Sequence, residues 1–258
     1  MQHPHRLEPG TVWLVGAGPG DPELLTRKAE RLIFGADIVF YDALVGSGVL
    51  DLIPDHVERV SVGKRSGRHS KDQGSINDLL LAAARAGKCV VRLKGGDPSV
   101  FGRSTEEVEH LAAHGIKTNI CPGVTAASAA AASAGISLTL RGLARKLTFV
   151  TAHARGEEAL HLDWTSLAEA DASLAVYMGR AAAGTVAREL IAAGRKADTP
   201  VLVAVNVSLP SERIIRGRLD ALGFLVETIS DEEPTLLLIG EPMDAHRAPS
   251  MMKAVAWA

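Results

Sequence analysis

The chain has 258 residues, of which 47% are hydrophobic and 22% are charged, and its formal net charge is −2 at pH 7. That length can enclose one large hydrophobic core or two smaller ones. The nearly balanced charge argues against a dedicated nucleic-acid-binding protein.

The cysteine content and the N-terminus indicate where the protein works. Cys89 and Cys121 lie beside apolar, strand-like runs, which predicts buried free thiols in a reducing compartment and no disulfide or metal site. The N-terminal residues MQHPHRLEPG contain no apolar segment, so we expect no signal peptide. Residues 124–140 are of low polarity but too weakly apolar to span a bilayer. We therefore expect a soluble cytoplasmic protein.

A short apolar strand at residues 11–15 leads into the glycine-rich loop GAGPGDP at residues 16–22. This loop is not a dinucleotide-binding fingerprint, because Asp21 stands where the third glycine of G-x-G-x-x-G is required. Pro19 and Pro22 also remove two N–H donors that a pyrophosphate would use. The loop favours a neutral or cationic ligand, and a turn without a ligand is the alternative.

Apolar periodicity predicts a helix over residues 23–34 that ends at Gly35, followed by a strand over residues 38–41. The strand ends at Asp42. An acid in this position is also what a nicotinamide-dinucleotide site uses to bind its ribose. An NAD-dependent oxidoreductase therefore stays open as an alternative.

The next loop is basic. Its sequence VSVGKRSGRHS at residues 60–70 contains four basic side chains, Lys64, Arg65, Arg68 and His69. Glycines among basic residues after a strand favour an anion-receiving loop, with a solvated charged face as the alternative. Ser75 and Asp78 then predict the capped start of a helix that extends to Ala86 and ends at Gly87.

The most informative stretch is VRLKGGDPSVFGR at residues 91–103. It begins as the end of a strand over residues 88–93 and breaks at four residues that cannot continue a ladder, Gly95, Gly96, Asp97 and Pro98. Paired glycines allow positive φ and close approach of a ligand to the main chain. Ser104 and Glu107 fit a capping box that opens a helix to His114. The loop therefore predicts a ligand site at the carboxyl end of a strand, with a tight turn as the alternative.

The remaining pattern predicts two α/β domains. Four strand–helix units up to the strand at residues 117–120 predict a parallel sheet with right-handed crossovers. A second series of strands follows at residues 147–151, 175–177, 201–206, 213–216 and 235–239, with an edge-like strand at 213–216. We expect an N-terminal domain over 11–121, a linker over 122–145, a C-terminal mixed-sheet domain over 146–242 and a tail over 243–258.

Six motifs occur in one order along the chain: VGAGPGDPELLT (15–26), YDALV (41–45), VGKRSGRHS (62–70), VRLKGGDPSVFGRSTEE (91–107), CPGVTAAS (121–128) and YMG (177–179). In this order they resemble the tetrapyrrole methylase family, and within it the uroporphyrinogen-III C-methyltransferases. The resemblance extends from Thr11 to Gly240, nearly the whole chain. Each motif alone is modest evidence, whereas the ordered set is specific.

The resemblance implies a two-domain α/β fold, with a mostly parallel N-terminal sheet and a mixed C-terminal sheet, each flanked by helices. It implies S-adenosylmethionine bound between the domains of a homodimer, with S-adenosylhomocysteine as the product. The implied reaction methylates uroporphyrinogen III twice to give precorrin-2 for siroheme or cobalamin. Because the chain starts almost at the first strand, the resemblance implies the stand-alone methyltransferase without the dehydrogenase/chelatase module.

By motif position, the resemblance also implies site residues. The donor site would be formed by Pro19, Gly95, Gly96, Asp97, Val100, Thr125, Ala126, Met178 and Val207. Asp42 would accept a proton, although a ribose contact or a helix cap are alternatives for it. Lys64 would donate a proton, and Arg103 would handle the substrate. Candidate partners for the substrate carboxylates are Lys64, Arg65, Arg68, Arg103, Arg141 and Arg145. The resemblance implies no metal.

The chain departs from the family pattern at residues 137–141, which read SLTLR, and at Ala152, Ser99, Ser104 and Val207, where the family has a glycine at the position of Val207. Another tetrapyrrole substrate and a non-catalytic ligand-binding relative therefore stay open as further alternatives. The main expectation is that the bends at residues 16–22 and 95–98 lie side by side as walls of one cleft.

Overall fold

The computed structural model describes residues 7–63, 73–152 and 160–244. The chain divides into two compact units, residues 1–126 and 127–258. The division falls inside the segment that the sequence predicts as a linker. The bounds given above for the four segments remain a prediction.

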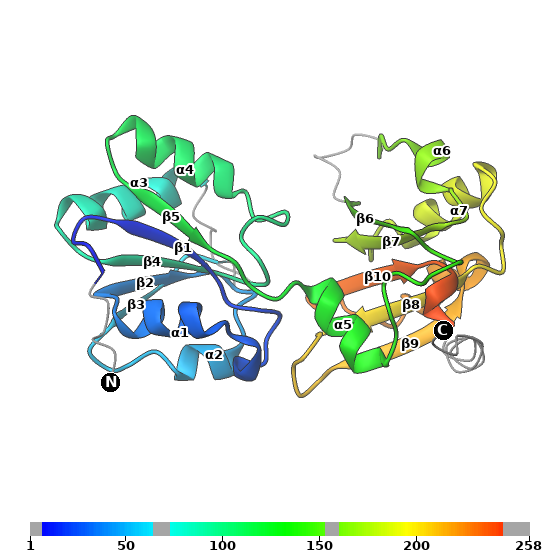
Figure 1. The fold of residues 1–258 in the computed structure, drawn as a ribbon, viewed down its shortest axis with the longest axis horizontal. Coiled ribbons are helices and arrows are strands. Elements are labelled where there is room, and N and C mark those ends of the chain that lie inside the picture. Colours follow the sequence, from blue (N-terminus) through cyan, green and yellow to red (C-terminus); the bar gives the residue numbers. More distant parts are fainter. Residues whose placement is uncertain (1–6, 64–72, 153–159, 245–258) are drawn as a thin grey trace, which may run out of the picture. The chain divides into compact units, whose positions relative to one another are not determined.

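The first unit contains a parallel sheet of five strands in the order β3-β2-β4-β1-β5 (Figure 1). Its strands are β1 (Val12–Gly16), β2 (Ile38–Tyr41), β3 (Glu58–Ser61), β4 (Val90–Lys94) and β5 (Thr118–Cys121). Its helices are η1 (Pro22–Leu24), α1 (Arg27–Phe34), α2 (Ser47–Asp51), α3 (Gln73–Arg85) and α4 (Ser104–Ala113). The parallel sheet expected from the sequence is confirmed.

Helices cover both faces of this sheet, with α1 and α2 on one side and α3 and α4 on the other (Figure 1). Strand β4 is buried along its whole length. Val91 and Leu93 belong to the core under α1 and α2, and Val90 belongs to the core under α3 and α4. Since side chains alternate along a strand, Arg92 and Lys94 lie on the same face as Val90.

The second unit contains a mixed sheet in the order β6-β7-β10-β8-β9. Its elements are α5 (Ala126–Ala134), β6 (Lys146–Thr151), α6 (Trp164–Leu167), β7 (Ala172–Tyr177), α7 (Ala183–Ala192), β8 (Pro200–Val205), β9 (Arg213–Arg218), η2 (Leu219–Ala221), α8 (Leu222–Leu225), β10 (Thr235–Ile239) and η3 (Glu241–Met243). Strands β6 and β7 are parallel, and the other pairs are antiparallel. The mixed sheet and the edge position of β9 are therefore as expected.

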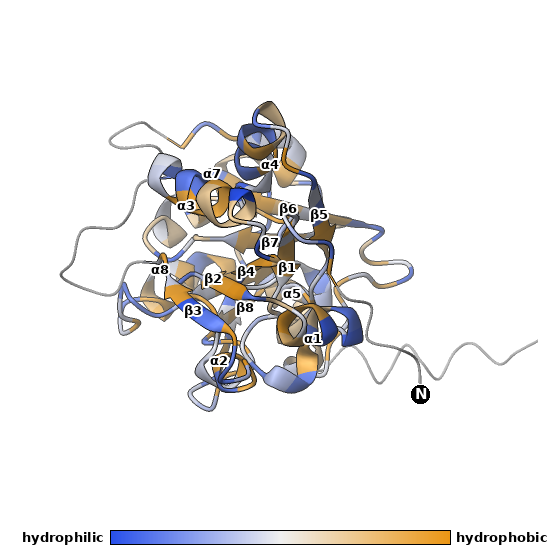
Figure 2. Ribbon diagram, turned by 90° about the vertical axis from the view of Figure 1, so that its left-hand side faces the viewer, coloured by the Kyte–Doolittle hydropathy of each residue, from blue (hydrophilic) through white to orange (hydrophobic). Residues whose placement is uncertain are grey.

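One hydrophobic core joins β7, β8 and β10 to α6, α7 and α8. In the first unit, Figure 2 shows β2 coloured mainly as hydrophobic. Helix α5 is attached near the edge strand instead, since Arg216 donates to the Ala134 carbonyl over 2.7 Å. Both cysteines are free and buried, as the sequence predicts.

The predicted helix over residues 23–34 is wrong over residues 23–26. Pro22 starts the short turn η1, which Asp21 caps by accepting from Glu23 N. Leu25 is extended, and α1 starts only after Thr26, whose hydroxyl accepts from Ala29 N over 3.0 Å. A threonine cap satisfies one of the first helical N–H groups, so the helix begins there.

Both predicted serine caps are also wrong. Ser75 lies inside α3, which already includes Gln73. At α4 the capping residue is Arg103, with φ 54°, and Ser104 Oγ donates to the Pro98 carbonyl. Glu107 does not reach back to the helix start, because its side chain is turned into the protein to meet two buried cations.

Candidate functional site

The two glycine-rich bends of the first unit lie against each other, as expected from the sequence. Ala17 N donates to the Lys94 carbonyl over 2.8 Å, directly after β1 and at the end of β4. Gly18 and Gly96 exchange two backbone hydrogen bonds, of 3.2 and 2.6 Å. Both residues have φ 69°, a value that favours glycine. The bends therefore form one continuous main-chain surface.

The third neighbouring strand joins this surface through Gly123, which follows β5. A Cβ at Gly123 would stand 2.2 Å from the Gly96 carbonyl oxygen and 2.9 Å from Gly16 Cα. A Cβ at Gly16 would stand 2.6 Å from Gly123 Cα. Close backbone packing therefore requires glycine at both positions. At Gly96, by contrast, a Cβ would meet nothing within 4 Å, so the main chain there borders open space that a ligand could approach.

Asp97 fixes these loops to one another. Its Oδ2 accepts from Gly123 N over 2.9 Å, and its Oδ1 accepts from the backbone N and the hydroxyl of Ser99. The carboxylate is therefore already held by the protein and places one negative charge beside the glycine surface. Pro19 and Val100, the other residues that the sequence predicts for the donor site on these loops, are half-buried.

Two further predicted donor residues lie at one edge of the mixed sheet. Strands β7 and β8 run in the same direction because each is antiparallel to β10. Met178 and Val207 follow these strands, at the edge where β10 begins. Met178 has φ 54° and is 50% exposed. Val207 is buried between Asn206 and Ser208, which have φ values of 51° and 61°.

Such left-handed conformations are costly for residues other than glycine, and they gather at functional sites in proteins.

Thr125 and Ala126 lie at the N-terminal end of α5. The start of that helix is connected to β7, since Ala127 N donates to Tyr177 Oη over 3.3 Å.

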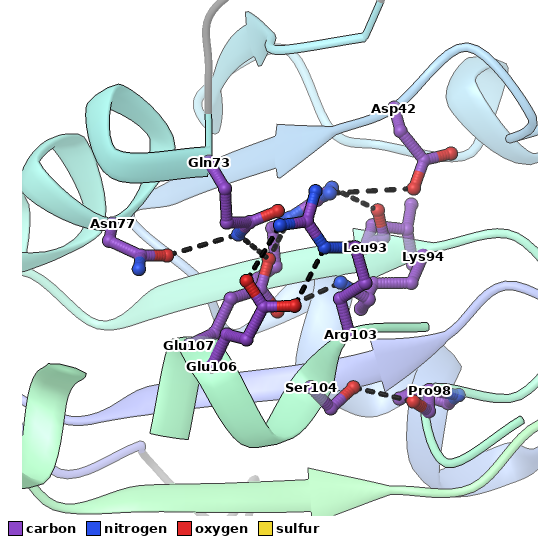
Figure 3. Close-up of polar contacts among 11 residues, drawn as sticks. Asp42, Gln73, Asn77, Leu93, Lys94, Pro98, Arg103, Ser104, Glu106 and Glu107 are labelled. Carbon is purple, nitrogen blue, oxygen red and sulfur yellow. Dashed lines mark hydrogen bonds and ion pairs between the residues drawn. The ribbon is translucent and has the colours of Figure 1, made fainter. Parts of the chain in front are cut away.

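Asp42 follows β2 at the carboxyl edge of the parallel sheet (Figure 3). Its Oδ1 accepts from Leu44 N over 3.1 Å, and its Oδ2 is 3.5 Å from Arg92 Nη2. The side chain of Asp42 is 24% exposed, whereas that of Arg92 is 5% exposed. A carboxylate with one buried cationic neighbour and access to solvent suits a group that exchanges protons with a ligand.

The cation beside Asp42 belongs to a buried group of charges that the sequence did not reveal to us. Glu107 has no exposed side-chain surface and lies 3.2 Å from Arg92 Nε and 2.8 Å from Lys94 Nζ. Gln73 Nε2 also donates to it over 3.3 Å. Burial, followed by the neighbouring Arg92 charge, lowers the pKa of Lys94, and Glu107 opposes this. The available signal was the alternation of Arg92 and Lys94 within an apolar strand, which requires a buried carboxylate opposite.

The predicted substrate-handling Arg103 is exposed and forms a two-pronged contact with Glu106 on the first turn of α4, with distances of 2.8 and 2.6 Å. Hydrogen bonding to Glu106 raises the pKa of the Arg103 guanidinium, which stays cationic. Arg141 and Arg145 are exposed in the second unit. Lys64, Arg65, Arg68 and His69 lie outside the described residues.

Within the described ranges, no group of three or more His, Cys, Asp or Glu side chains is placed to hold a metal ion. In the same part of the chain, every helix is too short or too polar to cross a membrane.

The sequence matches the family of Tetrapyrrole (Corrin/Porphyrin) Methylases over residues 11–223. It is similar to the siroheme synthase of Nitrosomonas europaea, with 43% identity over 238 residues, which cover 92% of this chain and 50% of that protein. The crystal structure of the uroporphyrin-III C-methyl transferase from Thermus thermophilus, complexed with S-adenyl homocysteine, is 41% identical with a TM-score of 0.77. That match covers 91% of this chain and 93% of the other.

A cobalt precorrin-4 methyltransferase, a cobalamin biosynthetic enzyme, is 29% identical with a TM-score of 0.81, and the match covers 95% of this chain and 99% of that one. These structures confirm the fold class expected from the sequence. The chain spans about half the length of the siroheme synthases that it matches.

Proposed function

Because this chain belongs to the tetrapyrrole methylases, we propose that it transfers methyl groups from S-adenosylmethionine to carbon atoms of uroporphyrinogen III. Two transfers give precorrin-2, a precursor of siroheme and cobalamin. The observation that carries the proposal is the paired glycine surface of Gly18 and Gly96, which exposes main chain at the carboxyl edge of a parallel sheet. It occurs in a chain 41% identical to a uroporphyrin-III C-methyl transferase whose structure contains S-adenyl homocysteine.

Motif position supports the following donor residues: Pro19, Gly95, Gly96, Asp97, Val100, Thr125, Ala126, Met178 and Val207. Bound S-adenosylmethionine supplies an electrophilic methyl group on a positively charged sulfur. The open space at Gly96 and the charge of Asp97 fit a cationic ligand that approaches the main chain.

The remaining chemistry belongs to the tetrapyrrole and to three side chains. A pyrrole carbon is itself the nucleophile, so the reaction needs no activated serine or cysteine, and catalysis rests on alignment with the donor. Asp42 accepts the proton that the methylated macrocycle loses, and Lys64 donates a proton. Arg103 binds a substrate carboxylate, exchanging its exposed contact with Glu106 for one with the ligand.

The assembly and the location of the enzyme are part of the same proposal. It acts as a homodimer in the cytoplasm, where the buried free thiols of Cys89 and Cys121 stay reduced. Sedimentation of the purified chain tests the dimer, and a monomer at micromolar concentration would contradict it.

The test of the function is anaerobic incubation with S-adenosylmethionine and uroporphyrinogen III, followed by mass spectrometry of the tetrapyrrole. Two methyl increments are expected.

Asp42→Asn should keep the affinity for S-adenosylhomocysteine in calorimetry but slow turnover by about 100-fold or more. Arg103→Ala should weaken use of the tetrapyrrole far more than donor binding.

Each alternative has its own outcome in these experiments. Binding of NAD without binding of S-adenosylhomocysteine would replace the methylase with an oxidoreductase. Donor binding without any methyl increment would favour a non-catalytic relative. The likeness to a cobalt precorrin-4 methyltransferase makes another tetrapyrrole the second candidate substrate, and faster turnover of a corrin precursor would identify it.

A further inference from the structure

We infer that Glu107, fully buried on α4, is a positioning residue that holds the Arg92 guanidinium against Asp42, and that this contact sets the rate of proton removal. The inference rests on the proposed function, in which Asp42 accepts the proton. Neither Glu107 nor Arg92 touches a reacting atom in this scheme, so both act through Asp42.

All three nitrogen atoms of the Arg92 guanidinium are engaged. Nε donates to Glu107 Oε1 over 3.2 Å, Nη1 donates to the Leu93 carbonyl over 2.9 Å, and Nη2 lies 3.5 Å from Asp42 Oδ2. A planar group with three fixed contacts has one orientation. Because two of these contacts lie inside the protein, they determine where the third nitrogen meets Asp42.

Glu107 is what keeps Arg92 buried in that orientation. Arg92 lies in a strand between Val91 and Leu93, both of which have no exposed surface. A buried cation without a partner is strongly unfavourable. The Glu107 carboxylate compensates it and is itself fixed by Lys94 on its other oxygen. Asp42, Glu107, Arg92 and Lys94 together carry two charges of each sign, so the group is neutral.

The group of four charged residues extends from the core to the carboxyl edge of the sheet, where Asp42 lies. Arg92, Lys94 and Glu107 are each at most 6% exposed in their side chains, whereas Asp42 is 24% exposed at the carboxyl edge of the sheet. The contact from Arg92 to Asp42 extends the group to the side chain that meets the ligand.

Lys94 provides a matched control for Arg92. Both cations lie on β4 and bind the Glu107 carboxylate, and their side chains are 5% and 6% exposed. They differ in their contact with Asp42, which lies 3.5 Å from Arg92. Arg92→Met and Lys94→Met therefore remove the same kind of buried contact. We expect kcat to fall by about 100-fold or more for Arg92→Met and by less than about fivefold for Lys94→Met. The Kd for S-adenosylhomocysteine should change by less than about threefold in both.

Glu107 is tested in a charge-balanced background, because Glu107→Gln alone leaves two buried cations with too little compensation and can prevent folding. The double variant K94M/E107Q retains Asp42 and Arg92 as a neutral pair. It should unfold cooperatively in urea, yet its kcat should fall by at least about tenfold, since Arg92 has lost its anchor. Arg92→Lys keeps the charge but replaces the planar guanidinium, with its three engaged nitrogen atoms, by a single ammonium group, so it should not restore the rate.

The outcomes separate this inference from the proposed function. Equal losses of kcat for Arg92→Met and Lys94→Met, or a folded double variant with the kcat of Lys94→Met, would overturn the role of Glu107 while the methylase stands. Failure of the unmodified chain to methylate uroporphyrinogen III would remove the proposed function and this inference with it.

Discussion

The carboxyl edge of the parallel sheet and the edge of the mixed sheet where β10 begins solve the same geometric problem with different residues. In the parallel sheet, the bends directly after β1 and β4 turn at glycines, with φ 69° at both Gly18 and Gly96. At the other edge it turns at Met178, Asn206 and Ser208, with φ values between 51° and 61°.

The difference shows that the two edges pack in different ways. At the first edge three strand ends pack backbone against backbone, so Gly16 and Gly123 have no room for a Cβ. At the second edge the turns carry side chains, and these residues hold strained conformations because the neighbouring strands fix them. The first edge is therefore built for close main-chain approach and the second for side-chain contact.

The largest expected effect tests the packing at the first edge. Gly123→Ala would place a Cβ 2.2 Å from a backbone oxygen that cannot move alone, so it should lower the free energy of unfolding by about 3 kcal/mol or more. Urea denaturation measures this. Gly115→Ala is the control, because its φ is 74° but its Cβ would meet nothing within 4 Å; it should lose only about 1 kcal/mol. Equal losses would show that backbone packing is not what requires glycine.

The next effect concerns the carboxylate that joins the loops. Asp97→Ala leaves Gly123 N without its acceptor, which should lower the free energy of unfolding by about 1–3 kcal/mol and weaken the binding of S-adenosylhomocysteine. Ser99→Ala removes only an exposed hydroxyl contact to the same carboxylate and should lose less than about 0.5 kcal/mol. Calorimetry and urea denaturation measure both variants, and similar results for the two would contradict the assigned role of Asp97.

The conformation of the second edge can be tested at Met178. Glycine is normally less favourable than alanine in a folded chain, but at φ 54° the order should reverse. Met178→Gly should be more stable than Met178→Ala by about 1 kcal/mol, because alanine retains the Cβ that disfavours this conformation. At the first edge Gly96→Ala should lose a similar amount. A more stable alanine at position 178 would show that the two edges do not share this backbone requirement.

The smallest effect depends on pH at the end of β5. Burial raises the pKa of the Cys121 thiol, so in the folded protein the thiol stays neutral where an unfolded chain would ionise it. The free energy of unfolding should therefore fall as the pH rises through about 8.5, by up to about 0.8 kcal/mol at pH 9. Cys121→Ala should lack this part of the pH dependence in urea denaturation. The same slope in both proteins would mean that water reaches this edge.

The contrast between the edges also explains what the sequence could predict. Glycines, prolines and apolar runs mark the parallel sheet and its glycine-rich loops, so the bends around Gly18 and Gly96 could be expected to meet. Nothing in the sequence marks the left-handed turn at Met178, which the surrounding strands impose, whereas Asn206 is of a residue type that adopts this conformation more readily.

The capping predictions failed for a related physical reason. Ser104 and Glu107 have the spacing of a capping box, but burial of Arg92 and Lys94 requires the Glu107 carboxylate elsewhere, and that requirement depends on contacts between strand and helix. The spacing of residues along the sequence cannot predict a contact between a helix and a strand that are separated in the sequence.

The balance of charge among Asp42, Glu107, Arg92 and Lys94 has a consequence for the evolution of this protein. A neutral residue at position 107 alone would leave two buried cations with only the partly exposed Asp42 to compensate them, so it should persist only together with a second change that removes a cation. Covariation among positions 92, 94 and 107 should therefore be visible across diverged relatives, with lineages that lose the acid also losing a base.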